Sequence, residues 1–258
     1  MFQQINKALD NILGIKIIRT SNKKISNNIK AKLQDNPFFI EFIGLPGTGK
    51  TTLLRKVIQS VNINRKWYLP EEFISQHGDK DSACFYTKEH LNLINSKISS
   101  ILSRGYIPSE ELSLVHHFIK SVQKEALLQH YNRNYTIVLD EGIFNNFREE
   151  ILFLLQAGDE KSKYLLYHRA FIECINTPEN IARQIIRRKE LTGLIHPDYQ
   201  NKTFEELIKV QKKIIKDRRL FLQRLESFNS PILYINAADD NVKNTEKVLS
   251  FIEKYQQG

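Results

Sequence analysis

The sequence predicts an α/β protein whose core is a doubly wound, five-stranded parallel sheet with flanking helices. Three observations lead to this prediction. Five short apolar runs, rich in aromatic and β-branched residues, alternate with helical patterns along the chain. A glycine-rich loop follows the first run, and an acidic pair follows the third. The predicted strands are residues 38–43, 66–69, 135–139, 171–175 and 232–235.

Length and charge limit the alternatives. A chain of 258 residues is long enough for one sizeable domain with a small appendage. The net charge of +9 suits an anionic ligand, a nucleic acid or an acidic membrane surface, and does not choose among them. Cys84 and Cys174 stand far apart, so we expect no disulfide framework and a reducing compartment. We see no secretory signal and no apolar run of membrane-spanning length, and therefore expect a cytoplasmic protein.

Residues 1–36 differ in composition from the rest and form a predicted N-terminal extension to a main domain of residues 37–258. Apolar residues fall on one helical face of this segment, and basic residues follow them. We expect a helix that packs on the main domain and then a solvated basic loop. Weak docking of residues 1–24 to a membrane surface or a partner is the alternative. The apolar residues are Ile5, Leu9, Ile12 and Leu13, and the basic ones are Lys16, Arg19, Lys23 and Lys24.

Between the first predicted strand and the first helix, residues 44–51 read GLPGTGKT and match the phosphate-binding pattern GxxxxGK[ST]. Glycines allow successive backbone N–H groups to close around an anion, and the following helix adds the positive end of its dipole. Lys50 is expected to reach the β- and γ-phosphates, and Thr51 to ligate Mg²⁺. The predicted nucleotide-contacting residues of this stretch are Gly44, Leu45, Pro46, Gly47, Thr48, Gly49, Lys50, Thr51 and Thr52.

The second predicted strand ends at Pro70 and is followed by Glu71 and Glu72. Open α/β sheets bind ligands at the carboxyl ends of their strands, so either carboxylate is a candidate general base. The alternative is that both belong to the first turn of a helix, where the helix dipole favours acidic residues.

Long helical patterns over residues 87–104 and 109–131 separate the second strand from the third. The third strand ends in Asp140 and Glu141, the arrangement of a Walker B element. A carboxylate beside the phosphate-binding loop can hold Mg²⁺ directly or through water, which assigns Asp140 to that role. Glu141 stays open, because a residue at this position either polarises water in a hydrolytic ATPase or helps to position an acceptor.

A helical stretch over residues 146–156 leads toward the fourth strand, and Thr177 with Pro178 then opens a helix. Arg183 and Arg187 lie four residues apart on that helix, so both can face one phosphate group. A solvated basic face is the alternative. Residues 189–202 carry loop signals, and a lid at about 189–203 fits there. A capping box at 203–206 begins a helix to about residue 228, and a last helix covers about 242–255.

From about Pro37 to its end, the chain resembles the P-loop nucleoside and nucleotide kinases, especially the thymidylate-kinase and deoxynucleoside-kinase group. The resemblance implies an ATP-dependent kinase with a lid. It implies that the arginines at 183, 187 and 188 neutralise the transferred phosphoryl group. It also implies that the turn Ala237, Ala238 and Asp239 contacts the adenine. The segments that carry the resemblance are GLPGTGKT (44–51), VLDEG (138–142), CINTPENIARQIIRR (174–188) and ILYINAAD (232–239).

The leading hypothesis is an ATP- and Mg²⁺-dependent kinase that transfers the γ-phosphoryl group to a hydroxyl or phosphate of a small or carrier-linked acceptor. This family usually has Asp-Arg or Glu-Arg after the third strand, whereas this chain has Asp140-Glu141. The second hypothesis is therefore a P-loop ATPase in which Glu141 activates water and hydrolysis switches a partner. A third, a polynucleotide kinase or nucleic-acid binder, rests on the charge alone, and we see no aromatic-interleaved basic platform for it. No Asn-Lys-x-Asp element is present to read guanine, which favours ATP over GTP.

Overall fold

The computed structural model describes residues 38–61, 67–77, 86–130, 135–156, 165–166, 168–193 and 196–255. The predicted N-terminal extension, residues 1–36, lies outside the described residues, and so does Cys84. Within the part of the chain that the structure describes, no helix has both the length and the apolarity needed to cross a membrane.

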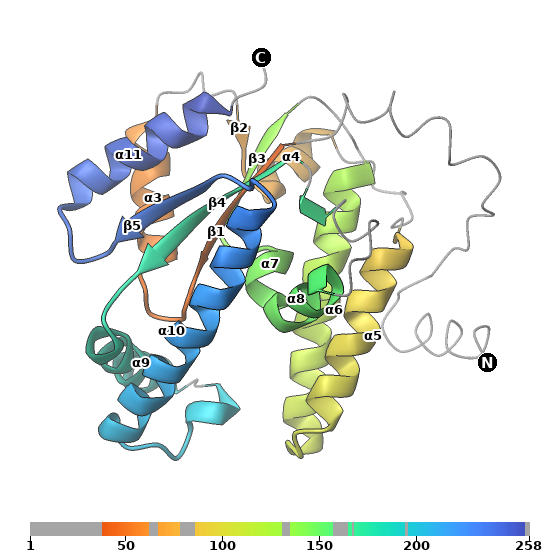
Figure 1. Ribbon diagram of the computed structural model, residues 1–258, viewed down its shortest axis with the longest axis vertical. Coiled ribbons are helices and arrows are strands. Elements are labelled where there is room, and N and C mark those ends of the chain that lie inside the picture. The colour runs from red at the N-terminus through yellow and green to blue at the C-terminus, as the bar shows by residue number, and fades with distance from the viewer. Residues whose placement is uncertain are drawn as a thin grey trace.

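Five parallel strands form one sheet in the order β2-β3-β1-β4-β5 (Figure 1). The strand β1 lies at the centre and pairs with both β3 and β4. The chain therefore winds outward in both directions from β1, and the predicted α/β class with its doubly wound parallel sheet is confirmed. The strands are β1 (Phe38–Gly44), β2 (Trp67–Tyr68), β3 (Thr136–Leu139), β4 (Arg169–Ile175) and β5 (Ile232–Asn236).

Helices connect the strands and cover both faces of the sheet (Figure 1). Those before β4 are α3 (Lys50–Ser60), α4 (Pro70–His77), α5 (Lys88–Leu102), α6 (Pro108–His130), α7 (Ile143–Asn146) and α8 (Arg148–Gln156). Those after it are α9 (Pro178–Thr192), the short 3₁₀ helix η2 (Pro197–Tyr199), α10 (Phe204–Ser227) and α11 (Asn241–Lys254).

Two helix boundaries differ from the sequence prediction. The helix expected over residues 146–156 is α8, which begins two residues later, at Arg148; the short helix α7 precedes it, with the fully buried Phe147 between the two. The loop expected from Lys189 begins later, because α9 continues to Thr192 and ends at Gly193 in the left-handed conformation. The capping box predicted at the start of α10 is present, with the Thr203 side chain accepting the N–H of residue 206.

One face of the sheet is apolar and lies under α3 and α11 (Figure 1). Alternate residues of a strand point to opposite faces, so Ile40 and Phe42 share this face with Ile172 of β4. Val57 of α3 and Val248 of α11 pack against them, and all five side chains are fully buried. Burial of this kind supplies the main favourable free energy of folding.

The opposite face contains phenylalanines and aliphatic residues together with three buried charges, Glu41 of β1 and Arg169 and Glu173 of β4. The helices α5, α6, α7, α8 and α10 contribute residues to the core on this side. A buried charge is costly unless it is paired, so each of these three residues must have partners among the covering helices.

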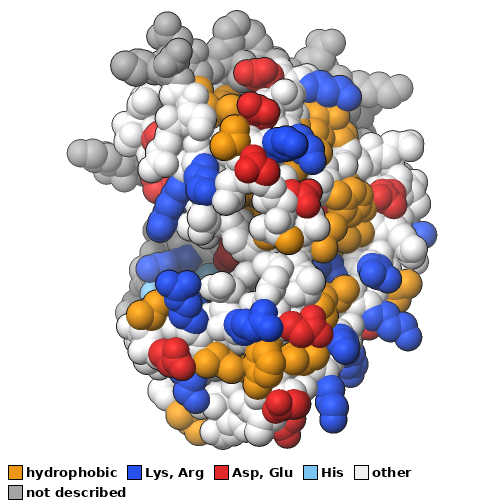
Figure 2. Space-filling view, turned by 90° about the vertical axis from the view of Figure 1, so that its left-hand side faces the viewer, with side chains coloured by type: hydrophobic (Ala, Val, Ile, Leu, Met, Phe, Trp, Pro, Cys, Tyr) orange, Lys and Arg blue, Asp and Glu red, His pale blue; other side chains and the backbone are white. Residues whose placement is uncertain are grey.

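The carboxyl ends of the strands point toward the lower half of Figure 1, where α9 and the turn between α5 and α6 lie. Ligands of doubly wound sheets bind at this end. Figure 2 shows a hollow at mid-height on the side of α3 and α9, with Lys and Arg side chains around it.

Candidate nucleotide-binding site

The loop of residues 44–49 has the backbone geometry of an anion cradle. Gly44, Gly47 and Gly49 have φ angles of 148°, 85° and 90°, a region that side chains disfavour. A Cβ on Gly44 would lie 2.7 Å from the backbone oxygen of Cys174, so only glycine fits between the loop and β4. At Gly49 the chain enters α3, and the first N–H groups of this helix point into the loop.

The ammonium group of Lys50 lies over this loop. The Lys50 side chain is 5% exposed, and its Nζ donates to the backbone oxygens of Gly44 at 2.8 Å and Leu45 at 3.2 Å. The carboxylate of Glu141 lies 3.4 Å from the same nitrogen. The loop therefore holds a positive charge at the place where phosphate oxygens would enter, and one acidic side chain lies beside it.

Thr51 and Asp140 bring the two predicted nucleotide-binding elements into contact. The Thr51 hydroxyl donates to Oδ2 of Asp140 at 2.9 Å, although 89 residues separate them in the chain. Oδ1 of Asp140 is buried and has no hydrogen-bond partner among the described residues. Burial raises the pKa of Asp140, and the hydrogen bond from Thr51 opposes that shift.

These two side chains fit Mg²⁺. A buried carboxylate oxygen without a partner, next to a hydroxyl, is the kind of oxygen pair that Mg²⁺ takes from a protein when phosphates and water complete its shell. Within the described part of the chain, no group of three or more His, Cys, Asp or Glu side chains could hold a metal by itself. A magnesium ion here would therefore be shared between the protein and a nucleotide.

A buried carboxylate that the sequence analysis missed holds this region in place. Glu41 of β1 accepts backbone N–H groups from Gly142 at 3.1 Å, Phe144 at 3.4 Å and Asn145 at 2.8 Å. The Asn145 side chain in turn accepts the N–H of Gly44 at 3.2 Å. Glu41 thus connects the turn after β3 to the phosphate-binding loop. A Cβ on Gly142 would lie 2.5 Å from its carboxylate.

Glu41 belongs to a buried group of two acids and one base. Arg169 donates to Glu41 at 2.8 Å, to Glu125 of α6, and to the backbone oxygen of Leu165 at 3.2 Å. Burial raises the pKa of Glu41 to about 7, against the opposing effect of Arg169, and burial likewise raises the pKa of Glu125. A charged residue inside the apolar run FFIEFIG was the available sequence signal for this group.

The helix α9, which carries the predicted lid arginines, packs against the loop. A Cβ on Gly47 would lie 3.0 Å from Cβ of Gln184 and 3.4 Å from the backbone oxygen of Ile181. Arg187 and Arg188 follow Gln184 by three and four residues, so they continue the helix surface that starts at the loop. Arg183 is exposed and donates to the Asn180 side chain at 2.7 Å.

The turn after β5 also reaches the loop. Cβ of Ala237 would lie 3.9 Å from a Cβ placed on Gly49, which is ordinary van der Waals contact. The N–H of Ala238 is held by the Asn236 side chain at 3.0 Å. Ala237, the first of the three residues predicted to contact the adenine, is therefore a neighbour of the phosphate-binding loop.

Glu71 and Glu72 have contacts outside this cluster. Glu72 accepts the N–H of Leu69 at 2.9 Å and so closes the first turn of α4. Glu71 is exposed and accepts from Lys124 of α6 at 2.6 Å. Both lie in the first turn of a helix, which is the alternative that the sequence left open. The acid that the structure places beside Lys50 is Glu141.

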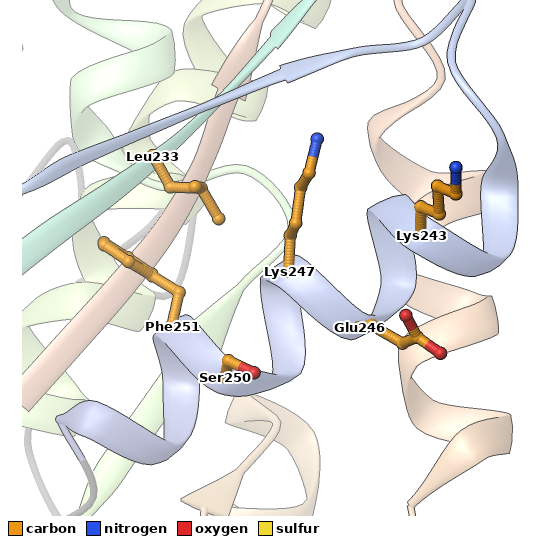
Figure 3. Close-up of a pocket in the computed structure, with 6 residues that line it drawn as sticks. All are labelled: Leu233, Lys243, Glu246, Lys247, Ser250 and Phe251. Carbon is orange, nitrogen blue, oxygen red and sulfur yellow. The ribbon is translucent and has the colours of Figure 1, made fainter.

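A surface depression of about 550 Å³ lies between β5 and α11 (Figure 3). Leu233 of the strand faces Phe251 of the helix, and Lys243 and Lys247 extend from one side of α11. None of the residues that line it belongs to the predicted nucleotide-contacting set. The depression is therefore separate from the candidate site.

Comparison with known proteins gives structural neighbours only. No protein-family model matches the chain, and no curated protein sequence matches it. Shikimate kinase from Bacteroides thetaiotaomicron aligns with 84% of this chain and 98% of its own, at 13% identity and a TM-score of 0.41. Deoxyadenosine kinase from M. mycoides with bound dCTP aligns with 84% of this chain and 99% of its own, at 14% identity and a TM-score of 0.38.

Proposed function

We propose that this protein is an ATP- and Mg²⁺-dependent phosphotransferase that moves the γ-phosphoryl group to a hydroxyl or phosphate of a small or carrier-linked acceptor. The observation that carries the proposal is the contact between Thr51 and Asp140 beside Lys50. It joins a phosphate-binding loop, a strand-end carboxylate and a buried ammonium group at one point, which is the arrangement that phosphoryl transfer needs.

Each residue of the cluster has a proposed task. The loop N–H groups and Lys50 bind the phosphates, and Thr51 and Asp140 hold the metal. Mg²⁺, when bound, neutralises charge on the phosphate oxygens. Arg183 and Arg187, with Arg188 beside them, stabilise the charge that spreads over the transferred group. Residues 237–239 contact the adenine.

Glu141 is our proposed general base for a hydroxyl acceptor. Its carboxylate lies 3.4 Å from Lys50 and 44% of its side chain is exposed, so an incoming molecule can reach it. The acceptor hydroxyl gives its proton to Glu141, and the acceptor oxygen bonds to the γ-phosphorus. The bond from that phosphorus to the bridging oxygen breaks, and ADP leaves.

The same position of Glu141 favours hydrolysis as a second candidate function. A carboxylate beside the P-loop lysine can accept a proton from water as well as from an acceptor, and the product is then free phosphate. The protein would in that case be an ATPase that acts as a switch on a partner.

The test is transfer from γ-labelled ATP to a pooled acceptor panel, with acceptor-bound label and free phosphate counted separately. We expect acceptor-bound label, reduced about 10³-fold or more in Lys50→Met, because this variant removes the charge that contacts the transferred group. Lys56→Met, which changes a lysine six residues further along the same helix, is the matched control and keeps its activity. Free phosphate alone, lost in both Lys50→Met and Glu141→Gln, would replace the kinase with the ATPase.

A further inference from the structure

Three segments that are distant in sequence meet at one charged cluster, which we call the mouth cluster. It comprises Arg104 and Tyr106 from the turn between α5 and α6, Arg148 and Glu149 from the start of α8, and Asp198 from η2. The Tyr106 hydroxyl donates to Asp198 at 2.7 Å, and Arg104 lies 3.4 Å from the same carboxylate. Through its other terminal nitrogen, Arg104 lies 3.7 Å from Glu149. These contacts connect η2, which belongs to the predicted lid, to the turn between α5 and α6 and to the start of α8.

Arg148 is a partly buried charge of the mouth cluster. Its side chain is only 19% exposed, and its one acidic partner within ion-pair distance among the described residues is Glu149, at 3.6 Å. That distance exceeds a hydrogen bond, and Arg104 shares the same carboxylate. Burial lowers the pKa of Arg148 and the positive charge of Arg218 lowers it further, although Glu149 and the more distant Asp217 oppose these effects. A second anion beside Arg148 would therefore stabilise the charge of this partly buried guanidinium.

The side chains around Arg148 supply this second anion only in part, because the carboxylate of Asp217 on α10 is exposed and acts on Arg148 from beyond ion-pair distance. Arg218 of α10 is paired with Glu173 through two hydrogen bonds, at 2.7 and 2.8 Å, so this carboxylate is already engaged. Gln211 lies seven residues before Arg218 on the same face of α10, and its side chain is fully buried. The Tyr199 hydroxyl of η2 interacts with this amide, but neither polar atom of Gln211 has a partner at hydrogen-bond geometry among the described residues. Unsatisfied buried amides are rare, and a polar ligand would satisfy this one.

The position of Arg148 relative to the phosphate-binding loop is set by α7. The Asn145 side chain accepts the N–H of Gly44, and Arg148 follows Asn145 by three residues. Arg148 is also close enough to Arg218 to be affected by its charge, and Arg218 and Lys50 both act on Cys174 near the carboxyl end of β4. A molecule held by Arg148 would therefore lie at the same end of the sheet as the loop. This is where an acceptor must be to reach a γ-phosphate.

We infer that Arg148 binds a negatively charged group of the acceptor, a carboxylate or a phosphate, and that the amide of Gln211 contacts the same molecule. Glu149 is the anion that Arg148 contacts until the acceptor arrives. The inference rests on the proposed phosphotransferase function and adds a substrate class to it: the acceptor is a small anion that also carries the group to be phosphorylated.

The first experiment uses matched acceptors with γ-labelled ATP and Mg²⁺. One arm pairs hydroxy acids with their amides, and the other pairs sugar phosphates and nucleoside monophosphates with their uncharged parents. We expect label on the charged member of a pair. We also expect Arg148→Met to raise the KM for that acceptor about 10- to 100-fold, because it removes hydrogen bonds to a charged group. The KM for ATP stays unchanged, and Arg219→Met, an exposed arginine of α10, is the matched control.

The outcomes separate the inference from the proposed function. Label on neutral acceptors only, or an acceptor KM that Arg148→Met leaves unchanged, overturns the inference and keeps the kinase. Free phosphate without acceptor label overturns both. The two arms of the panel decide between carboxylate and phosphate.

A binding measurement covers the case in which Arg148→Met folds poorly. With the loop occupied by Mg²⁺ and a non-hydrolysable ATP analogue, inorganic phosphate is titrated and the Tm of each protein is followed. We expect phosphate to raise the Tm of the wild type and of Arg219→Met, and to have little effect on Arg148→Met. Arg148→Lys keeps the charge and the packing of the side-chain stem, and we expect an intermediate shift. Equal shifts in all four proteins would overturn the inference.

Discussion

The same two central strands contribute to both faces of the sheet, and the faces differ in chemistry. Ile40, Phe42 and Ile172 pack against aliphatic residues of α3 and α11 on one side. Glu41, Arg169 and Glu173 are equally buried on the other side. Their polar atoms are paired with side chains of α6 and α10 and with the backbone after β3.

The difference shows what buried charges contribute in this fold. A buried ion pair is weak evidence for stability, because desolvation offsets most of the attraction between the charges. Apolar contacts stabilise without a directional requirement, whereas hydrogen bonds fix the position of each partner. Glu41 fixes the turn after Asp140 and, through Asn145, the loop at Gly44. The apolar face stabilises the sheet, and the charged face positions the site.

The largest effect is expected when Arg169 is removed. Arg169→Met leaves the carboxylates of Glu41 and Glu125 buried without their shared base. Breaking a buried pair in this way costs about 3–5 kcal/mol of unfolding free energy. Urea denaturation of both proteins measures the loss, and a loss below about 1 kcal/mol would show that the two acids accommodate each other without Arg169.

The matched control lies on the other face of the same strand. Ile172→Val removes one buried methylene under α3 and α11 and costs about 0.5–1.5 kcal/mol. Because Ile172 contacts no site residue in our account, we expect its transfer rate to match the wild type well below its Tm. A transfer rate of Ile172→Val well below that of the wild type would remove the distinction between the faces.

The second prediction concerns pH. Folding raises the pKa of Glu41 from an ordinary 4.5 to about 7 through burial, although Arg169 opposes the shift. Between these two values the unfolded chain has released the proton and the folded protein retains it. The free energy of unfolding therefore falls as the pH rises through this range, by about 3 kcal/mol in total.

Glu41→Gln removes this titration, and we expect the difference in stability between the two proteins to change in that range. His90 of α5, whose pKa burial lowers to about 4, stays neutral there, and Glu125 is present in both proteins. Urea denaturation at several pH values between about 5 and 8 gives the difference directly. The glutamine variant becomes relatively more stable as the pH rises. Parallel curves would mean that Glu41 ionises at its ordinary pKa.

The strands and the phosphate-binding loop could be predicted because each is a contiguous stretch whose own residues carry the signal: an apolar run for a strand, and GLPGTGKT for the loop. The Thr177 and Thr203 caps were predicted for the same reason. The short helix α7 and the break at the buried Phe147 were not predicted, because four residues are too few to show helical periodicity. Tertiary packing decides where a break of this kind falls.

The charged face and the mouth cluster could not be predicted for a different reason. Arg169 and Glu41 are 128 residues apart, and Tyr106 and Asp198 are 92 apart. The sequence does not show which charged residues form pairs. Because most charged residues are solvent-exposed, nothing in it indicated that these would be buried. Glu141 was recognised as part of the site, but its distance of 3.4 Å from Lys50 required the fold.

The smallest effect is expected at the contact that joins η2, in the predicted lid, to the turn between α5 and α6. Tyr106→Phe removes the hydroxyl that donates to Asp198 at 2.7 Å and leaves the ring in place. Because both side chains are partly exposed to solvent, the hydrogen bond contributes about 0.5–1.5 kcal/mol. Its loss should favour local opening of η2 and leave the global free energy of unfolding nearly unchanged.

Amide hydrogen exchange at Tyr199 and Gln200 reports this opening, because their N–H groups are bonded to the backbone oxygens of His196 and Pro197. We expect exchange about 3- to 10-fold faster in Tyr106→Phe, which corresponds to about 1 kcal/mol. Tyr234→Phe is the matched control, since it removes a comparable hydroxyl contact, with Glu226 at 2.6 Å, near the edge strand β5. If both variants exchange like the wild type at these amides, Tyr106 does not hold the lid. Faster exchange in Tyr106→Phe alone extends the positioning role from the charged face of the sheet to the lid.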